Sequence, residues 1–187
     1  MKRQLFLLLL VVLGCSKVGF AQLPPYYNQQ PAASGNSFPF ATAAGKGCQF
    51  IVNPGEFALP SLAPAGNNIT EIWVYINANA SVINYTSFQI RLGQISNASD
   101  PSWTAASLYP GAMTTVFGPG PYAMASSATA RWVSFTLSSP FAYDPAQALI
   151  VEITQCGASP TGPTINQAAV APSPRRKFSN PTACVPV

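Results

Sequence analysis

The sequence predicts an all-β fold, an antiparallel β-sandwich of jelly-roll type. Nineteen prolines and thirteen glycines among 187 residues interrupt the chain too often for long amphipathic helices. Between these interruptions lie short segments rich in β-branched and aromatic residues, in which apolar and polar side chains alternate with period two. Such alternation is typical of antiparallel sheets that have one face on a core.

Four segments show the clearest alternation and are expected to form the central strands, at residues 69–77, 83–92, 131–137 and 148–154. Their inward-facing side chains are expected to be Ile72, Val74, Ile76, Phe88, Ile90, Leu92, Val133, Phe135, Leu137, Leu149, Val151 and Ile153. Weaker alternation predicts further strands at residues 48–52, 114–117 and 175–178.

The chain divides into four stretches. Residues 1–21 are a predicted signal peptide, and 22–37 a flexible leader. Residues 38–156 are expected to form the β-sandwich core. Residues 157–187 are expected to form a Pro/Gly-rich tail whose final strand packs on the sandwich. The run Gly118-Pro119-Gly120-Pro121 is expected to be a connection between strands.

The first residues have the order of a secretory signal. A positive start at Lys2 and Arg3 is followed by an apolar run, and small residues precede a cleavage site after Ala21. The apolar run is too short to span a bilayer, which needs about 20 residues. A lipoprotein box ending at Cys15 is the alternative, in which Cys15 is lipidated and becomes the N-terminus. Either route predicts a secreted or cell-surface protein.

Charge and composition exclude several function classes. The formal charge is +4, but removal of residues 1–21 leaves six basic and five acidic residues, a net charge of +1. A chain this nearly neutral has no basic stripe for nucleic acid. The absence of histidine excludes a Ser-His-Asp triad and metal sites that use imidazole.

Three cysteines remain after export, so one disulfide and one spare thiol are expected in an oxidising compartment. A bond between Cys156 and Cys184 is favoured because it would tie down the tail. A bond between Cys48 and Cys156 is the alternative.

Several short motifs resemble those of a known group of proteins. They are Asn36-Ser37-Phe38-Pro39-Phe40, Cys48-Gln49-Phe50-Ile51-Val52, Glu56-Phe57, Ile69-Thr70-Glu71-Ile72, Phe88-Gln89-Ile90-Arg91-Leu92-Gly93, Pro140-Phe141-Ala142-Tyr143-Asp144-Pro145 and Leu149-Ile150-Val151-Glu152-Ile153. Together they resemble a β-sandwich module of secreted and cell-surface proteins of Bacteroidota and Planctomycetota, over about residues 34–156. The resemblance implies a bacterial extracellular sandwich and supplies no catalytic residues.

The outward faces of the predicted strands carry the candidate binding residues, which are Glu71, Trp73, Tyr75, Tyr85, Gln89, Arg91, Trp132 and Glu152. Aromatic rings stack on the apolar faces of sugars, while carboxylate, amide and guanidinium groups bond to the hydroxyls. This composition predicts a polysaccharide site. The alternative is that the aromatic side chains cover a second layer, pack under loops or form cross-strand pairs that stabilise the sheet.

Catalysis is not expected. The five carboxylates are Glu56, Glu71, Asp100, Asp144 and Glu152, and a glycosidase would need two of them across a cleft. Glu71 and Glu152 could be neighbours on outward faces, whereas Asp144-Pro145 is typical of a turn. No calcium-loop pattern is present, so we expect no metal and no cofactor. The basic run 175–177 is expected to be an exposed strand edge.

These observations predict a non-enzymatic extracellular binding or adhesion module, with polysaccharide as the ligand class. The alternative is a structural module of a surface layer or extracellular matrix, without a small ligand. Expected partners are polysaccharide or other cell-surface proteins, with no nucleic acid and no transmembrane segment in the mature chain.

Overall fold

The structure is a computed structural model that describes residues 23–28, 34–41, 45–64, 66–96, 109, 111–167 and 175–179. The described residues form nine strands and no helix, and every strand pairing is antiparallel. This confirms the predicted all-β antiparallel sandwich. The predicted signal peptide, with Cys15 and Ala21, lies outside the described residues.

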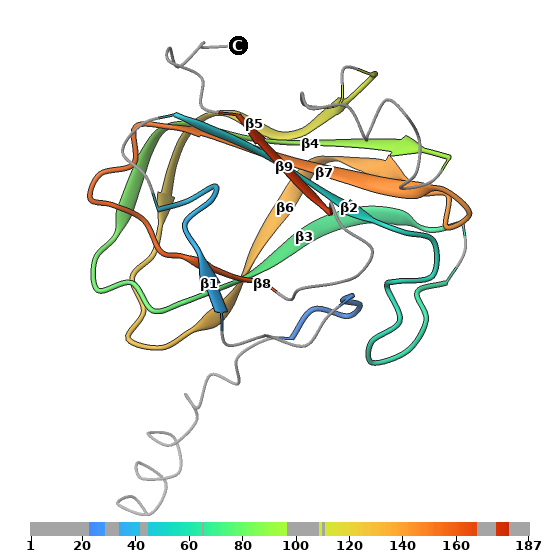
Figure 1. The fold of residues 1–187 in the computed structure, drawn as a ribbon, viewed down its shortest axis with the longest axis horizontal. Coiled ribbons are helices and arrows are strands. Elements are labelled where there is room, and N and C mark those ends of the chain that lie inside the picture. Colours follow the sequence, from blue (N-terminus) through green and yellow to red (C-terminus); the bar gives the residue numbers. More distant parts are fainter. Residues whose placement is uncertain are drawn as a thin grey trace, which may run out of the picture.

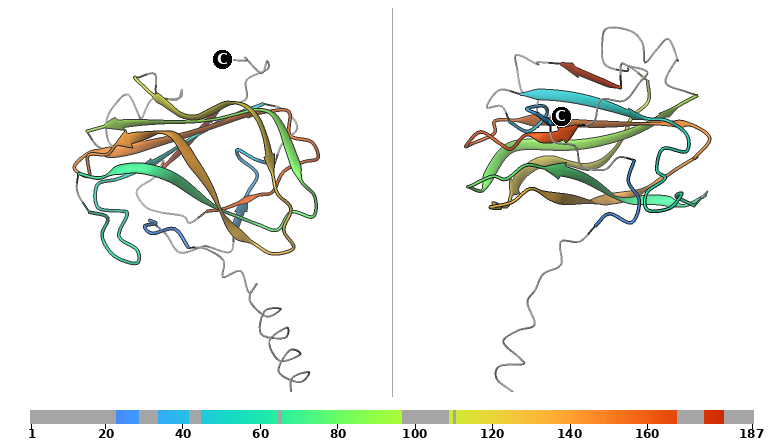
Figure 2. Two further views of the ribbon diagram at one scale, coloured as in Figure 1. Left: turned by 180° about the vertical axis from the view of Figure 1, so that it is seen from behind. Right: turned by 60° about the horizontal axis from the view of Figure 1, so that its bottom comes forward.

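The strands form two sheets, which are the two layers of the sandwich (Figures 1 and 2). In spatial order, the four-stranded sheet contains β1 (Ser34–Asn36), β8 (Ile165–Gln167), β3 (Asn68–Ile76) and β6 (Arg131–Ala142). The five-stranded sheet contains β5 (Thr114–Met124), β4 (Ile83–Ile95), β7 (Ala148–Cys156), β2 (Lys46–Val52) and β9 (Arg176–Ser179).

The strand pairs are nested along the chain. β4 pairs with β5, β3 with β6, β2 with β7 and β1 with β8. Taken in this order, the four pairs lie in alternate sheets. The chain from β1 to β8 is therefore one long antiparallel hairpin whose successive strand pairs belong to the two sheets in turn. The jelly-roll type of this sandwich stays a prediction.

The core lies between the sheets, as the alternation predicts. On β4, Phe88, Ile90 and Leu92 are fully buried, and on β6 Phe135 and Leu137 face them. Each strand therefore presents its apolar face to the other sheet, which is the arrangement that removes most apolar surface from water.

Strand β5 is longer than predicted and runs through the Gly-Pro segment to Met124. Opposite this segment the register of β4 and β5 shifts three times, and β5 is an edge strand. An edge strand tolerates proline because one side of its backbone needs no ladder partner. Gly118 has φ of +73°, and a Cβ there would lie 2.1 Å from the carbonyl oxygen of Phe88, so only glycine fits.

Strands β1 and β8 are absent from the sequence prediction. Each has only three residues, too few to show a period, and they lie in the predicted leader and tail. The leader and tail are therefore partly built into the four-stranded sheet. The predicted strand at 175–178 is confirmed as β9, which pairs with β2.

Candidate binding site

The outer face of the four-stranded sheet gathers three of the predicted aromatic residues. The register of β3 and β6 places Tyr75 opposite Trp132 and Trp73 opposite Ser134. The inward residues of β3, such as Val74, pack on the core, so these aromatic side chains point the other way. The sequence prediction of this face is confirmed for Trp73, Tyr75 and Trp132.

A fourth ring joins them from the leader. The rings of Tyr75 and Trp132 meet edge to face, with centroids 5.3 Å apart and planes at 72°. The ring of Tyr27 lies 5.7 Å from that of Trp132. Two backbone hydrogen bonds with Leu59, at 2.9 and 3.1 Å, hold Tyr27 in place. We call the four side chains Tyr27, Trp73, Tyr75 and Trp132 the aromatic patch.

A carboxylate is fixed beside the aromatic patch. Glu71 lies opposite Thr136 in the register of β3 and β6. Its Oε1 accepts a hydrogen bond from Thr136 Oγ1, and its Oε2 accepts one from Trp73 Nε1, both at 3.2 Å. Each carboxylate oxygen can accept more than one hydrogen bond, so Glu71 keeps capacity for a ligand hydroxyl.

The aromatic patch is half-buried. The residues Tyr27, Trp73, Tyr75 and Trp132 all have intermediate exposure. Tyr75 and Trp132 form a cross-strand pair, which is the stabilising role considered as the alternative to binding. The contact between rings and their remaining exposure are compatible with both roles, because a sugar needs only one face of a ring.

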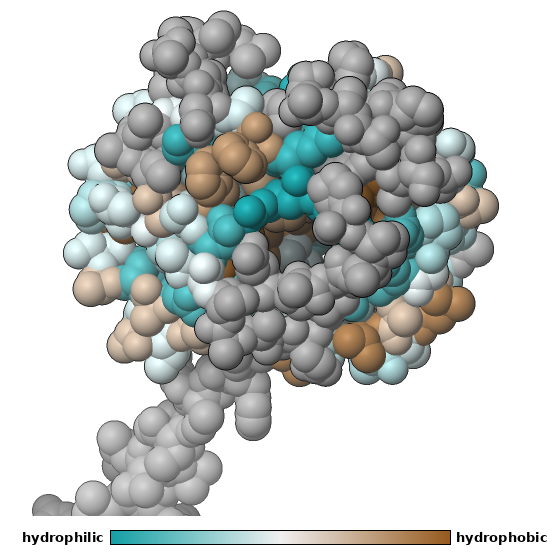
Figure 3. All heavy atoms as spheres, viewed as in Figure 1, coloured by the Kyte–Doolittle hydropathy of each residue, from teal (hydrophilic) through white to brown (hydrophobic). Residues whose placement is uncertain are grey.

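A cavity of about 740 Å³ borders the aromatic patch. We call it the interior cavity. Its lining includes Trp73, Tyr75 and Trp132 from the outer face, and also Val74 and Val151, which face the space between the sheets. The cavity therefore extends from the interior of the sandwich to the outer side of β3. The surface between β9 and β3 is hollowed in the view of Figure 3.

The free edge of β3 explains how one cavity can reach both faces. β3 pairs with β6 along one side, but on its other side it pairs with β8 only where Ile76 lies opposite Ile165. Among the described residues, no strand pairs with that side of β3 between Ile69 and Tyr75. Among the strands that the structure describes, β8 therefore covers this side of β3 at one position only.

The walls of the interior cavity differ in chemistry. The side chains of Val52, Val151 and Ile153 are buried branched aliphatics and line it from the five-stranded sheet. The charged lining includes Glu56 and Arg175, whose Nη1 lies 2.9 Å from the carboxylate of Glu56. Glu56 also accepts a hydrogen bond from the backbone N–H of Asn53 at 2.8 Å. This ion pair places no net charge on the cavity.

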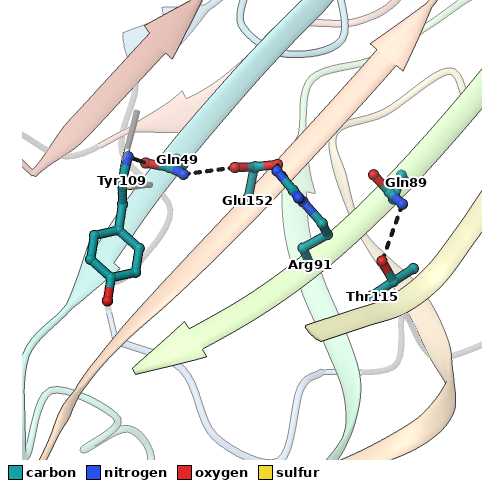
Figure 4. A network of polar contacts seen from close by, with 6 residues as sticks. All are labelled: Gln49, Gln89, Arg91, Tyr109, Thr115 and Glu152. Atoms are coloured by element: carbon teal, nitrogen blue, oxygen red, sulfur yellow. Dashed lines mark hydrogen bonds and ion pairs between the residues drawn. The ribbon is translucent and has the colours of Figure 1, made fainter. Parts of the chain in front are cut away.

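Three other predicted site residues, Gln89, Arg91 and Glu152, lie on the outer face of the five-stranded sheet. Figure 4 shows that Glu152 is held between Gln49 and Arg91, with Gln49 Nε2 donating at 2.6 Å and Arg91 Nε at 2.7 Å. Gln89 donates to Thr115 at 3.2 Å in the same view.

The carboxylate and amide groups of this polar row are buried, whereas 38% of the Arg91 side chain is exposed. Only 1% of Glu152 and 5% of Gln89 is exposed. Gln49 accepts a hydrogen bond from the backbone N–H of Tyr109 at 2.8 Å, which attaches the chain at Tyr109 to the sheet. A carboxylate this buried is stable because it is paired and hydrogen-bonded.

The predicted grouping of Gln89, Arg91 and Glu152 with the aromatic side chains is therefore wrong. The two groups occupy the outer faces of different sheets, with the core between them. Glu71 and Glu152 are separated in the same way, so they cannot flank one glycosidic bond. Alternation predicts whether a side chain points outward, but it does not assign the strand to a sheet.

Tyr85 is also corrected by the structure. It was expected to point outward, but only 2% of it is exposed and it packs in the core. The pairing of β4 with β5 shifts between Tyr85 and Phe88, which marks a bulge that reverses the alternation. Its hydroxyl donates to the carbonyl oxygen of Phe40 at 3.3 Å.

The basic run 175–177 differs from the exposed edge that was expected. Arg175 is paired with Glu56, and only 7% of Lys177 is exposed. Burial lowers the pKa of Lys177. β9 is an edge strand of its sheet, but Arg176 is half-buried and Lys177 is buried.

Cys48 is a free thiol and wholly buried on β2. Burial raises the pKa of Cys48 to about 12, although Arg176 lowers it slightly. The alternative bond between Cys48 and Cys156 is therefore not formed. The favoured bond between Cys156 and Cys184 stays a prediction because Cys184 lies outside the described residues.

The aromatic patch contains one residue that sequence reasoning missed, Tyr27. Its signal was the aromatic pair Tyr26-Tyr27 directly after two prolines, which favour an extended chain that can lie along a surface. Within the described part of the chain, no group of three or more acidic or cysteine side chains could hold a metal ion. Nor do the described residues include a helix that could cross a membrane.

No family model matches this sequence, and a search of curated proteins finds no match either. The resemblance to the sandwich module of Bacteroidota and Planctomycetota therefore stays a prediction.

Proposed function

We propose that this protein is an exported binding or adhesion module that recognises polysaccharide through the aromatic patch. The observation that supports it most is the grouping of Trp73, Tyr75 and Trp132 beside the carboxylate of Glu71 on one sheet face. Rings supply stacking surface for pyranose faces, and Glu71 accepts from sugar hydroxyls. The adjacent interior cavity provides the concave surface that ligand sites usually have.

The structural alternative, a module of a surface layer or matrix, relied partly on a spare cysteine for cross-linking. The burial and raised pKa of Cys48 disfavour that route, because a thiolate must form and be accessible for disulfide exchange. Binding is therefore the function that we favour. We propose no enzymatic activity.

The test is a glycan array followed by titration calorimetry on the best ligand. We expect the Trp132→Ala variant to bind about tenfold or more weakly, because Trp132 contacts both Tyr27 and Tyr75 and central aromatic side chains dominate binding energy. The control is Phe178→Ala, which removes an exposed ring on β9 that does not line the cavity.

Wild-type protein that binds no glycan, or a Trp132→Ala variant that binds as tightly as wild type, would contradict the proposal. A far-ultraviolet circular dichroism spectrum identical to that of wild type is required of both variants, so that a loss of binding is not a loss of fold.

A further inference from the structure

We infer that the interior cavity takes the hydrocarbon tail of an amphiphilic glycoside whose sugar stacks on the aromatic patch. The ligand would then be a sugar chain that carries a hydrocarbon tail, as a glycolipid does. The sugar part of this inference rests on the proposed function, whereas the tail part depends on the cavity alone.

The first argument is continuity. The aromatic patch and the apolar walls between the sheets line the same cavity. They are joined around the edge of β3, which has no partner strand among the described residues between Ile69 and Tyr75. A ligand whose sugar lies against Trp132 can therefore continue past this edge into the sandwich without crossing any strand that the structure describes.

The second argument is the chemistry of the inner wall. Val52, Val151, Ile153 and Ile165 are at most 8% exposed and carry no polar side-chain atom. Sugar hydroxyls placed against such a wall would lose water without gaining hydrogen bonds, which is costly. A hydrocarbon chain has no such cost.

The third argument is unfilled apolar surface. Ile72 and Val74 point from β3 into the space between the sheets, yet both are only partly buried and both line the cavity. A cavity of about 740 Å³ lies within the range of roughly 300 to 1,000 Å³ seen for small-molecule sites. Each tail methylene that covers this surface should raise affinity by about twofold to fourfold.

The test uses two series of probes, n-alkyl β-D-glucosides from methyl to octyl and n-alkanols of the same lengths, all below their micelle-forming concentrations. Binding is followed by titration calorimetry and by tryptophan fluorescence. In wild type, we expect affinity to rise with chain length in both series, with each glucoside binding more tightly than its alkanol.

Two variants and one control variant separate the contribution of the tail from that of the sugar. Val74→Phe fills the cavity and should abolish the dependence on chain length. Val133→Ile enlarges the residue paired with Val74, which does not line the cavity, and should keep the dependence. Trp132→Ala should weaken every glucoside by the same factor and leave the alkanols unchanged.

The outcomes distinguish the two proposals. If affinity does not change with chain length in wild type, or if the dependence survives in Val74→Phe, the inference about the tail is overturned. If the dependence is present but glucosides bind no better than alkanols, the sugar assignment and the glycolipid class are overturned, and only an alkyl site is left. If no glycan binds in the array, the proposed function fails by itself.

Discussion

The two halves of the sandwich are packed in different ways. Between β4, β5 and β6, the ring of Phe88 lies 5.0 to 6.0 Å from the rings of Phe40, Tyr85, Phe117, Tyr122 and Phe135. Between β2, β7 and β3, the facing side chains are mainly aliphatic, with Val52, Val74, Val151 and Ile153 beside the ring of Phe50, and the space between them is the interior cavity. We call these the filled half and the hollow half.

Side-chain size and edge closure together account for the difference. Packed sheets lie about 10 Å apart, a distance that aromatic rings from both sides can fill. Valine side chains are shorter, so Val52 and Val74 leave space between them. β5 and β6 contact each other and close the filled half, whereas among the described residues β8 pairs with β3 only at Ile76.

The filled half removes its apolar side chains from water and holds the sheets together. The apolar surface that borders the cavity lies in the hollow half, and under the proposed function this surface is available to a ligand.

Of the proposed substitutions, removal of a ring from the filled half should destabilise the fold most. Phe88→Ala should lower the free energy of unfolding by about 3 to 5 kcal/mol, because it removes a fully buried ring and leaves a cavity. Val74→Ala, in the hollow half, should cost about 1 kcal/mol or less because Val74 already borders empty space. Urea denaturation measures the free energy of unfolding of both variants. Equal losses in the two variants would contradict the difference in packing between the halves.

A smaller effect is expected from adding volume. Val133→Phe should destabilise the fold by about 1 to 3 kcal/mol, because Val133 packs against the core without bordering the cavity. Val74 is the residue of β3 that is paired with Val133, and it borders the cavity. Val74→Phe should therefore leave the free energy of unfolding within about 0.5 kcal/mol of wild type. Thermal unfolding of the two variants compares them, and a penalty for Val74→Phe as large as that for Val133→Phe would mean that the cavity cannot accept a ring.

The smallest effect concerns alkaline pH and the filled half. Burial raises the pKa of Tyr85 above its usual range, the nearby Tyr122 adds to the shift, and burial also raises the pKa of Tyr122. The folded chain favours the neutral form of both phenols. Their contribution to the free energy of unfolding is therefore fully present below about pH 10 and is lost as pH rises through the pKa values of the folded state.

Urea denaturation between about pH 9 and about pH 12 tests this dependence. The decline should be shallower in Tyr85→Phe than in wild type, while Tyr26→Phe, which changes an exposed tyrosine of the leader, should follow wild type. A decline that is identical in Tyr85→Phe and wild type would show that ionisation of this buried phenol does not limit the filled half.

Parts of the fold and site were predictable from the sequence for a local reason. The register is unbroken around Val74, Phe135 and Val151, over residues 71–76, 131–136 and 148–156, and the period of a strand sets the two faces wherever it begins. The outward positions of Trp73, Tyr75 and Trp132 followed from the same rule. Tyr85 did not follow it because the bulge before Phe88 inserts a residue that alternation cannot reveal.

The amino-acid sequence alone dictates the sandwich class and the face of each regular strand, since both arise from the spacing of apolar side chains within a few residues. Tertiary structure decides which sheet each strand joins and where the cavity forms. It also decides how Glu152 is buried against Gln49, which is 103 residues away along the chain. These depend on pairings between distant segments and on the length of β8, which local patterning does not encode.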